Sequence, residues 1–354
     1  MKIIVDKDIP FIEGRITGEE VVYLPGNKIS REFVKDADAL IIRTRTICNA
    51  RLLERTSVKL IATATIGTDH IDLPWCAENG ILVESAPGCN APGVAQYVFA
   101  SLFLNGFNPR KDVLGIIGYG NVGSTVGKWA SQMGVPIMVN DPYREERGMA
   151  DIDYRNLKEV LSNSDAVTLH VPLSTQGSYP TYHLIGKAEL EGMRKNAILV
   201  NTSRGGVVDE TALKNFIKSG KRRAIIDVWE KEPVIDKELL MLAETATPHI
   251  AGYSYEGKKR GTMMALKALE KHLGISINTE GLEVDSNAGR TAVITPQIIS
   301  SSYDPCIDSD ALKRNPGSFE ELRNNYDYRH EPLASAKIPY VQETEYPKNI
   351  SNND

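Results

Sequence analysis

Three polar residues have side chains suited to transferring a proton and binding a carboxylate substrate. Each follows an apolar run or lies beside a proline. Arg204 follows NAILVNTS, Glu232 precedes Pro233, and His249 follows TATP. A neutral imidazole is a base near neutral pH, and a carboxylate bonded to it orients it and stabilises its protonated form. A guanidinium is a planar, permanently charged fork that clamps a carboxylate. Each residue alone is more often structural, so the prediction depends on all three meeting.

A glycine pattern points to a phosphate-bearing cofactor. Gly118, Gly120 and Gly123 in GYGNVG fit GxGxxG, and the pattern stands between the strand-like VLGIIG and the helix-like VGSTVGKWASQMG. In that context the first glycine permits a tight turn, the second lets the backbone approach a pyrophosphate, and the third allows close helix packing. The helix N-terminus then holds the phosphates. A glycine pattern alone would be weak, but the strand–turn–helix setting indicates a dinucleotide site.

The next apolar run ends at Asp141, where a carboxylate would accept hydrogen bonds from the adenosine ribose and repel a 2′-phosphate. NAD is therefore expected over NADP, although Arg144 and Arg147 leave the exclusion of NADP open. Removing a hydride from a hydroxyl carbon also requires a base for the hydroxyl proton, and His249 can serve. The sequence thus predicts dehydrogenase chemistry.

The elements that must position these residues alternate between strand-like and helix-like. KIIVD, DALIIRTRT, VKLIATATIG and ILVESAPG form a first series, a long apolar helix follows from Ala91, and a second series begins at Asp112. Such alternation predicts parallel α/β sheets. Because ligands gather at the carboxyl ends of parallel strands, Arg204, Asp227, Glu232 and His249 are expected in one crevice.

Bulk composition excludes several classes. The chain has 354 residues, a net charge of -5 and no dominant basic stripe, so nucleic-acid binding has no electrostatic footprint. Its four cysteines lack metal-binding spacing, and no metal is expected. No apolar run reaches the ~20 residues of a membrane span, and MKIIVD begins a strand instead of a signal peptide. We expect a soluble cytoplasmic protein.

GIIGYGNVG, NTSRGGVVDETAL, DVWEKEP and TPHIAGYSYEGK stand in the order and spacing found in the D-isomer-specific 2-hydroxyacid dehydrogenases, which the chain resembles over residues 1–275. The resemblance implies a Rossmann-type NAD domain, 105–247, and a discontinuous flavodoxin-like substrate domain, 1–104 and 248–278, both doubly wound. ALKRNPGSFEELRNNYDYRHEP resembles the small C-terminal dimerisation domain of one branch, which acts on a phosphorylated four-carbon hydroxy acid. A homodimer is therefore expected, with residues 279–354 as its dimerisation segment.

The resemblance also assigns roles. Arg204, Glu232 and His249 would be catalytic, with His249 the proton donor in the reductive direction. The residues implied in NAD binding, beside the glycines, are Asn121, Val122, Asp141, Val171, Asp227 and Gly252. Those implied in binding the substrate are Thr44, Thr65 and Tyr253, and Arg43, one residue before Thr44, is the best-placed cation for the substrate phosphate.

Three alternatives remain. The fold and the catalytic residues do not separate this substrate from another D-2-hydroxy acid such as 3-phosphoglycerate or hydroxypyruvate. An NAD-sensing binding protein of the same fold is a second possibility, which the intact Arg204, Glu232 and His249 argue against. Tyr255 and Lys259 match the YxxxK of short-chain dehydrogenases, but those enzymes place their glycine pattern near the N-terminus, and here it begins at Gly118.

Overall fold

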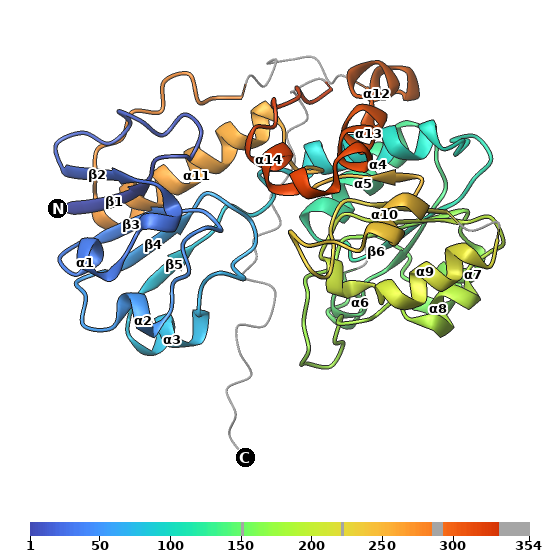
Figure 1. Cartoon of the computed structure of the whole chain (residues 1–354), viewed down its shortest axis with the longest axis horizontal. Coiled ribbons are helices and arrows are strands. Elements are labelled where there is room, and N and C mark those ends of the chain that lie inside the picture. The colour runs from blue at the N-terminus through green and yellow to red at the C-terminus, as the bar shows by residue number, and fades with distance from the viewer. Residues whose placement is uncertain (150–151, 221–222, 285–292, 333–354) are drawn as a thin grey trace. The chain divides into compact units, whose positions relative to one another are not determined.

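The computed structural model describes residues 1–149, 152–220, 223–284 and 293–332 (Figure 1). The chain divides into two compact units. The first contains Met1–Asn90 and, of the described residues, 255–284, and the second contains Ala91–Ser254 and 293–332. This division falls between residues 90 and 91 and between 254 and 255, so it counts the helix after Ala91 with the second unit. The functional domain boundaries expected from the sequence stay a prediction.

The first unit is built on five parallel strands in the order β2-β1-β3-β4-β5, which is the flavodoxin-like order. They are β1 (Lys2–Asp6), β2 (Glu20–Leu24), β3 (Ala39–Ile42), β4 (Leu60–Thr63) and β5 (Leu82–Glu84). The described helices of this unit are α1 (Arg31–Val34), α2 (Ala50–Leu53), α3 (Leu73–Glu78) and α11 (Tyr255–Leu273), with the 3-10 turn η1 (Gly26–Lys28).

Both faces of this sheet are covered. Leu266 and Leu269 of α11 pack with Ile3 and Val5 on one face, and α1 to α3 cover the other (Figure 1). Burial on both faces explains why β3 is wholly apolar and why β4 is apolar up to its last residue, Thr63. β2 lies at the edge and is only part-buried.

The second unit is built on six parallel strands in the order β11-β10-β9-β8-β6-β7. They are β6 (Leu114–Ile117), β7 (Ile137–Asn140), β8 (Ala166–Leu169), β9 (Ile198–Asn201), β10 (Arg223–Ile226) and β11 (Thr245–Ala246). Tyr154 adds a single parallel bridge to Val139 of β7, so the third strand of a Rossmann-type order is reduced to one residue. The order reverses at β6, which lies between β7 and β8.

Helices cover both faces of the second sheet as well. The described ones are α4 (Ala91–Leu104), α5 (Asn121–Gln132), α6 (Pro142–Glu146), α7 (Leu157–Asn163), α8 (Lys187–Gly192), α9 (Glu210–Lys218), α10 (Lys237–Leu242), α12 (Pro296–Ser302), α13 (Pro305–Arg314) and α14 (Phe319–Asn324), with 3-10 turns η2 (Gly205–Val207) and η3 (Pro316–Ser318). α4 and α5 share one apolar cluster, and α7 to α10 share the other. The predicted pair of doubly wound parallel sheets is confirmed.

The described C-terminal segment, residues 293–332, packs on the second unit. Leu312 of α13 and Phe319 of α14 are 0% and 1% exposed and belong to the same apolar cluster as α7 to α10. Ile299 of α12 belongs to the cluster of α4 and α5. This segment therefore completes the core of its own subunit, and its predicted part in dimerisation stays a prediction.

Candidate active site

The glycine turn has the geometry that the sequence predicts. Gly118, directly after β6, has φ +85°, and a Cβ there would lie 2.6 Å from the carbonyl oxygen of His170. A Cβ on Gly123 would lie 2.0 Å from the Gly118 carbonyl oxygen. Gly120 is the extended N-cap residue of α5. Both tight positions exclude any side chain, so strand and helix approach as closely as a pyrophosphate-binding turn requires.

Other predicted cofactor residues lie around this turn. Asn121 and Val122 are the first two residues of α5. Val171 follows β8, and its Cγ1 would lie 2.8 Å from a Cβ on Gly118. Since β6 and β8 are parallel neighbours, these residues stand at the same edge of the sheet. Their contact with NAD stays a prediction.

Asp141 is fixed by the turn itself. Its Oδ2 accepts a hydrogen bond from the Tyr119 backbone N–H at 2.8 Å, and its Oδ1 accepts one from Arg144 N–H at 3.1 Å. Arg144 packs inward, with Nε donating to the Tyr154 hydroxyl at 3.1 Å and the guanidinium 5.9 Å from the centre of the Tyr119 ring. The carboxylate is held beside the glycine turn, and one of the two arginines that left NADP open is already engaged.

His249 and Glu232 form a direct pair. His249 Nδ1 lies 2.8 Å from Glu232 Oε2, and Glu232 Oε1 accepts a hydrogen bond from Trp229 N–H at 3.0 Å. The two residues come from the loops after β11 and β10, adjacent parallel strands whose carboxyl ends share one edge. Burial acts to raise the pKa of the Glu232 carboxyl, but the hydrogen bond and charge of His249, helped by Trp229 N–H and Arg323, outweigh it and lower that pKa. The predicted base and the carboxylate predicted to orient it are therefore in direct contact, and their catalytic roles stay a prediction.

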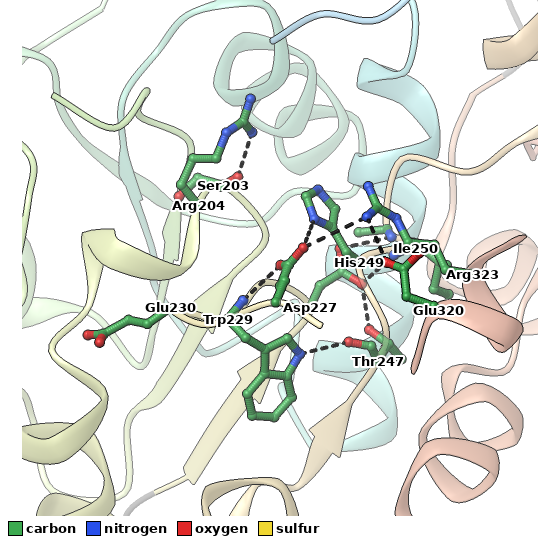
Figure 2. Close-up of polar contacts among 12 residues, drawn as sticks. Ser203, Arg204, Asp227, Trp229, Glu230, Thr247, His249, Ile250, Glu320 and Arg323 are labelled. Carbon is green, nitrogen blue, oxygen red and sulfur yellow. Dashed lines mark hydrogen bonds and ion pairs between the residues drawn. The ribbon is translucent and has the colours of Figure 1, made fainter. Parts of the chain in front are cut away.

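The loop that carries His249 is held by Asp227. The Asp227 carboxylate accepts hydrogen bonds from the Thr247 hydroxyl at 2.6 Å and from the N–H groups of Ile250 at 2.8 Å and Ala251 at 3.0 Å (Figure 2). Its carbonyl accepts the His249 N–H at 2.8 Å, and His249 adopts φ +59°. Burial raises the pKa of Asp227, against the effect of these donors and of His249. Asp227 thus helps to maintain an unfavourable backbone conformation at His249. Its predicted NAD contact stays a prediction.

Arg204 stands at the same edge, after β9. Its Nη1 donates to the Ser203 carbonyl at 2.8 Å (Figure 2), and its own carbonyl accepts from the Asn201 amide at 3.0 Å. A Cβ on Gly205 would lie 1.9 Å from the Trp229 carbonyl carbon, so this glycine lets the Arg204 loop pack against the loop after β10. The loop of Arg204 thus packs against the loop after β10, which carries Glu232. His249 and Glu232 contact each other directly.

Three predicted substrate residues lie in the first unit. Arg43 follows β3, and its Nε lies 3.0 Å from Oδ2 of the fully buried Asp6, with Nη2 3.4 Å from Asp8. Thr44 is exposed in the turn that follows. Arg43 therefore has two carboxylate partners that the sequence did not reveal, and these offset part of the charge expected to meet a phosphate.

Thr65 belongs to a chain of hydroxyl groups. Its Oγ1 lies 2.7 Å from the Thr63 hydroxyl and donates to the Gly67 carbonyl at 3.2 Å. The Thr63 hydroxyl lies 3.3 Å from His70 Nε2, and burial lowers the pKa of His70 to about 4. A neutral imidazole is thus connected to the Thr65 side chain through the Thr63 hydroxyl.

Tyr253 lies in the second unit, where the structure adds a residue that sequence reasoning missed. Gly252 and Tyr253 end a turn closed by Tyr253 N–H donating to the Ile250 carbonyl at 2.8 Å. Arg323 of α14 donates from Nε to the Tyr253 hydroxyl at 3.1 Å, across 70 residues of sequence, and its Nη1 lies 4.0 Å from Glu232 Oε2. No spacing or motif signals this contact.

Within the described ranges, no cluster of three or more histidine, cysteine or acidic side chains is arranged to hold a metal ion. No helix in the described part of the chain is long and apolar enough to cross a membrane.

The family profile described as D-isomer specific 2-hydroxyacid dehydrogenase, NAD binding domain, matches residues 96–251. A curated relative that is 45% identical matches 94% of the chain. The chain belongs to the D-isomer-specific 2-hydroxyacid dehydrogenases, and the predicted family is confirmed.

Three curated relatives that match 94% of the chain share one name within this family. The chain is 45% identical to erythronate-4-phosphate dehydrogenase of Bacteroides fragilis, over 94% of this chain and 97% of that protein. It is 42% identical to the enzyme of that name from Bacteroides thetaiotaomicron, over 94% and 98%, and 37% identical to that from Escherichia coli O7:K1, over 94% and 92%. The similarity thus extends to the described C-terminal segment and to one named branch.

Solved structures of the family are similar over a smaller share. D-lactate dehydrogenase from Aquifex aeolicus, complexed with NAD and lactic acid, gives a TM-score of 0.64 at 26% identity, covering 77% of this chain and 96% of that one. NAD-bound 3-phosphoglycerate dehydrogenase from Entamoeba histolytica gives 0.65 at 25% identity, covering 80% and 98%. Because those chains are almost fully matched, about a fifth of the present chain has no counterpart in them.

Proposed function

We propose that the protein oxidises 4-phospho-D-erythronate to (R)-3-hydroxy-2-oxo-4-phosphooxybutanoate with NAD, in pyridoxal 5′-phosphate biosynthesis. The observation that carries the chemistry is the 2.8 Å contact between His249 Nδ1 and Glu232 Oε2, in the same unit as a turn whose Gly118 and Gly123 leave no room for a Cβ. The observation that carries the substrate is the name shared by relatives that match 94% of the chain.

The residues present fit NAD. Gly118 and Gly123 leave no room for a side chain at their own positions in the turn before α5, so the backbone there can approach a pyrophosphate closely. Asp141 is fixed beside that turn and would accept the ribose hydroxyls while repelling a 2′-phosphate. When bound, NAD accepts the hydride that leaves C2 of the substrate.

The proton is handled by the chain's own residues. Neutral His249 takes the C2 hydroxyl proton through Nε2, because Nδ1 is committed to Glu232. The C2–H electron pair departs as hydride and the O–H pair forms the new carbonyl bond, so the products are a 2-oxo acid and a protonated imidazole. Glu232 stabilises that imidazolium by a charge-assisted hydrogen bond.

The remaining roles concern binding. Arg204 clamps the C1 carboxylate, since a guanidinium matches a carboxylate in two-pronged geometry. Thr44, Thr65 and Tyr253 position the rest of the acid, and Arg43 faces its phosphate. The protein acts as a homodimer in the cytoplasm, assembled through the C-terminal segment.

The test is the appearance of NADH from purified protein with NAD and 4-phospho-D-erythronate, beside 3-phosphoglycerate and D-glycerate. A parallel reaction includes a 2-oxo acid acceptor, in case the NADH formed stays bound. We expect a strong preference for the phosphorylated four-carbon acid. Turnover of the other acids alone would keep the mechanism and reject the substrate, and NAD binding without any turnover would favour an NAD-sensing protein.

A further inference from the structure

Arg323 joins the C-terminal segment to the proposed proton-transfer pair. It lies on α14, and its side chain is 18% exposed, compared with 21% for Glu232. Nη1 lies 4.0 Å from Glu232 Oε2, the oxygen that His249 Nδ1 also contacts, and Nε donates to the Tyr253 hydroxyl at 3.1 Å. Figure 2 shows the Arg323 side chain beside the His249 ring.

The segment that carries Arg323 is firmly attached to the loop that follows His249. Arg329 donates to the carbonyls of Ile250 at 3.0 Å and Tyr253 at 3.1 Å, and it also donates to the Ala251 carbonyl. The Ser254 hydroxyl donates to Glu331 at 2.6 Å. These hydrogen bonds connect the chain after α14 to the loop after His249. The position of Arg323 relative to His249 and Glu232 is therefore set by the fold.

The distances decide how Arg323 acts. At 4.0 Å from Glu232, the guanidinium is too far for a hydrogen bond but close enough for a substantial charge interaction in a part-buried site. Glu320, one turn earlier on α14, lies 3.9 Å from the same nitrogen, so it offsets only part of the charge. The hydrogen bond itself goes to Tyr253, which fixes the direction of the guanidinium.

A positive charge here favours one protonation state of the pair. With His249 neutral, the pair carries one negative charge, and with His249 protonated it carries none. Arg323 therefore stabilises the state in which His249 can accept a proton. Among the described residues, the other charged or titratable groups that interact with the pair or with Arg323 are Glu210, Asp227, Tyr253 and Glu320.

We propose that Arg323 is a positioning residue of the active site, which directs the Tyr253 hydroxyl and holds the His249–Glu232 pair in its proton-accepting state. The C-terminal segment then takes part in catalysis within its own subunit, in addition to any part in assembly. The inference rests on the proposed roles of His249 and Glu232.

The test compares Arg323→Met, Arg323→Lys and the control Arg314→Met across a pH series of kcat and kcat/KM for oxidation of 4-phospho-D-erythronate. Arg314 is exposed on neighbouring α13 and receives the same substitution. We expect R323M to lose about tenfold in kcat near pH 7 and to move the acidic limb of the profile up by about one pH unit, because a nearby positive charge is removed. In R323K the pH of the acidic limb should return most of the way to the wild-type value. R314M should match the wild type in both kcat and the pH of the limb.

Two further measurements separate the charge from the hydrogen bond and from general damage. Tyr253→Phe removes the acceptor for Nε but keeps the charge, so it should raise KM without moving the acidic limb. Thermal unfolding identifies a merely structural role: equal loss of activity at all pH values, a lower Tm and no rescue by lysine would overturn the proposal. An unmoved limb in R323M would overturn it as well.

A readout without turnover keeps this inference distinct from the proposed function. The imidazole NMR signal of His249, assigned with His249→Gln, is followed against pH in wild type and R323M. A titration that moves to higher pH in R323M supports the positioning role even if no 2-hydroxy acid is oxidised, in which case the proposed function alone fails. An unchanged titration removes Arg323 from the pair in either case.

Discussion

At the scale of single residues, the loop after β11 holds the proposed base, His249, in a defined position. His249 has φ +59°, a backbone region that non-glycine residues rarely adopt, and Asp227 holds the residues on either side of it. The sequence TATPHIAGY already predicted a histidine at the end of a strand. The backbone strain and the buried Asp227 anchor required the structure, because nothing in local sequence reports them.

His249→Ala tests the base directly. We expect kcat to fall at least about a hundredfold, which is the scale of a general base, while NADH binding followed by fluorescence stays near that of the wild type. Glu232→Gln should lose less, because the amide oxygen still accepts the Nδ1 hydrogen bond but no longer stabilises the imidazolium by charge. Near-normal turnover of His249→Ala would remove it from the mechanism.

Arg43 has an ion pair in the fold and a proposed contact with the substrate phosphate, and one substitution can separate the two. Its removal leaves the carboxylate of the fully buried Asp6 without its ion-pair partner, so Arg43→Ala should lower the free energy of unfolding by about 1–3 kcal/mol in urea titrations. Its proposed phosphate contact predicts, in addition, a KM increase that is far larger for the phosphorylated acid than for an unphosphorylated analogue. Equal KM increases for both would leave only the structural role.

A suitable comparison is Arg45→Ala, two residues further along and exposed. Its unfolding free energy should change little, since exposed charges contribute weakly to stability. A loss of stability equal to that of Arg43→Ala would show that the Asp6 pair is not the cause.

At the scale of elements, what the sequence predicts depends on burial. β1, β3, β4, β6 and β8 are covered on both faces and appear as apolar runs, so they were predictable. β2 is a part-buried edge strand and was missed. α12 and α13 were missed as well, because they are short helices in a polar stretch whose stability comes from a few buried contacts such as Leu312.

Glu210, the first residue of α9, and Glu230, in the loop after β10, form a pair of acidic residues whose protonation affects stability. Glu210 Oε1 accepts the Glu230 N–H at 2.8 Å, and Glu230 Oε1 accepts the Glu210 N–H at 3.2 Å. Burial, with the nearby acidic groups, raises the pKa of Glu210 from 4.5 to about 7. The folded protein thus holds this proton more tightly than the unfolded chain, so stability decreases as the pH rises through that interval.

Glu210→Gln should remove this pH dependence. The amide keeps an acceptor for Glu230 N–H but cannot ionise, so above pH 7 the variant should be more stable than the wild type by about 1–2 kcal/mol, a value reduced for the solvent that reaches a part-buried group. The measurement is urea unfolding at pH 5 and pH 8.

Glu238→Gln is the control of opposite sign. Hydrogen bonds from Lys218 and Lys214 lower the pKa of this exposed carboxyl, so its replacement should reduce stability at pH 8 instead of increasing it. An identical pH dependence in Glu210→Gln and wild type would show that Glu210 is ionised in the folded protein throughout.

At the scale of the whole molecule, the C-terminal segment was predicted from resemblance as a separate dimerisation piece. In the described residues it provides Leu312 and Phe319 to the core of the second unit and Arg323 to the candidate site. Sequence alone could not reveal this, because the contacts join positions far apart in the chain. Deleting residues 281–354 would therefore disturb folding and catalysis along with assembly, and a point change is the cleaner test of the homodimer.

Ile307 offers that change. It is 67% exposed on α13, and a large exposed apolar side chain on a segment predicted to pair is a candidate for a buried place in the dimer. We expect Ile307→Glu to give monomers by light scattering, because a carboxylate is costly to bury at such an interface, while Tm measured on the dilute protein stays close to the wild type.

Met241→Glu is the matched control, since Met241 is 61% exposed on α10, outside the C-terminal segment. It should leave the oligomeric state of the wild type unchanged. Dimers that persist in Ile307→Glu would place the subunit contact away from this face of α13. A wild type that is monomeric at all concentrations would reject the homodimer itself. The proposed role of Arg323 would still stand, because every contact that supports it lies in the second unit of a single chain.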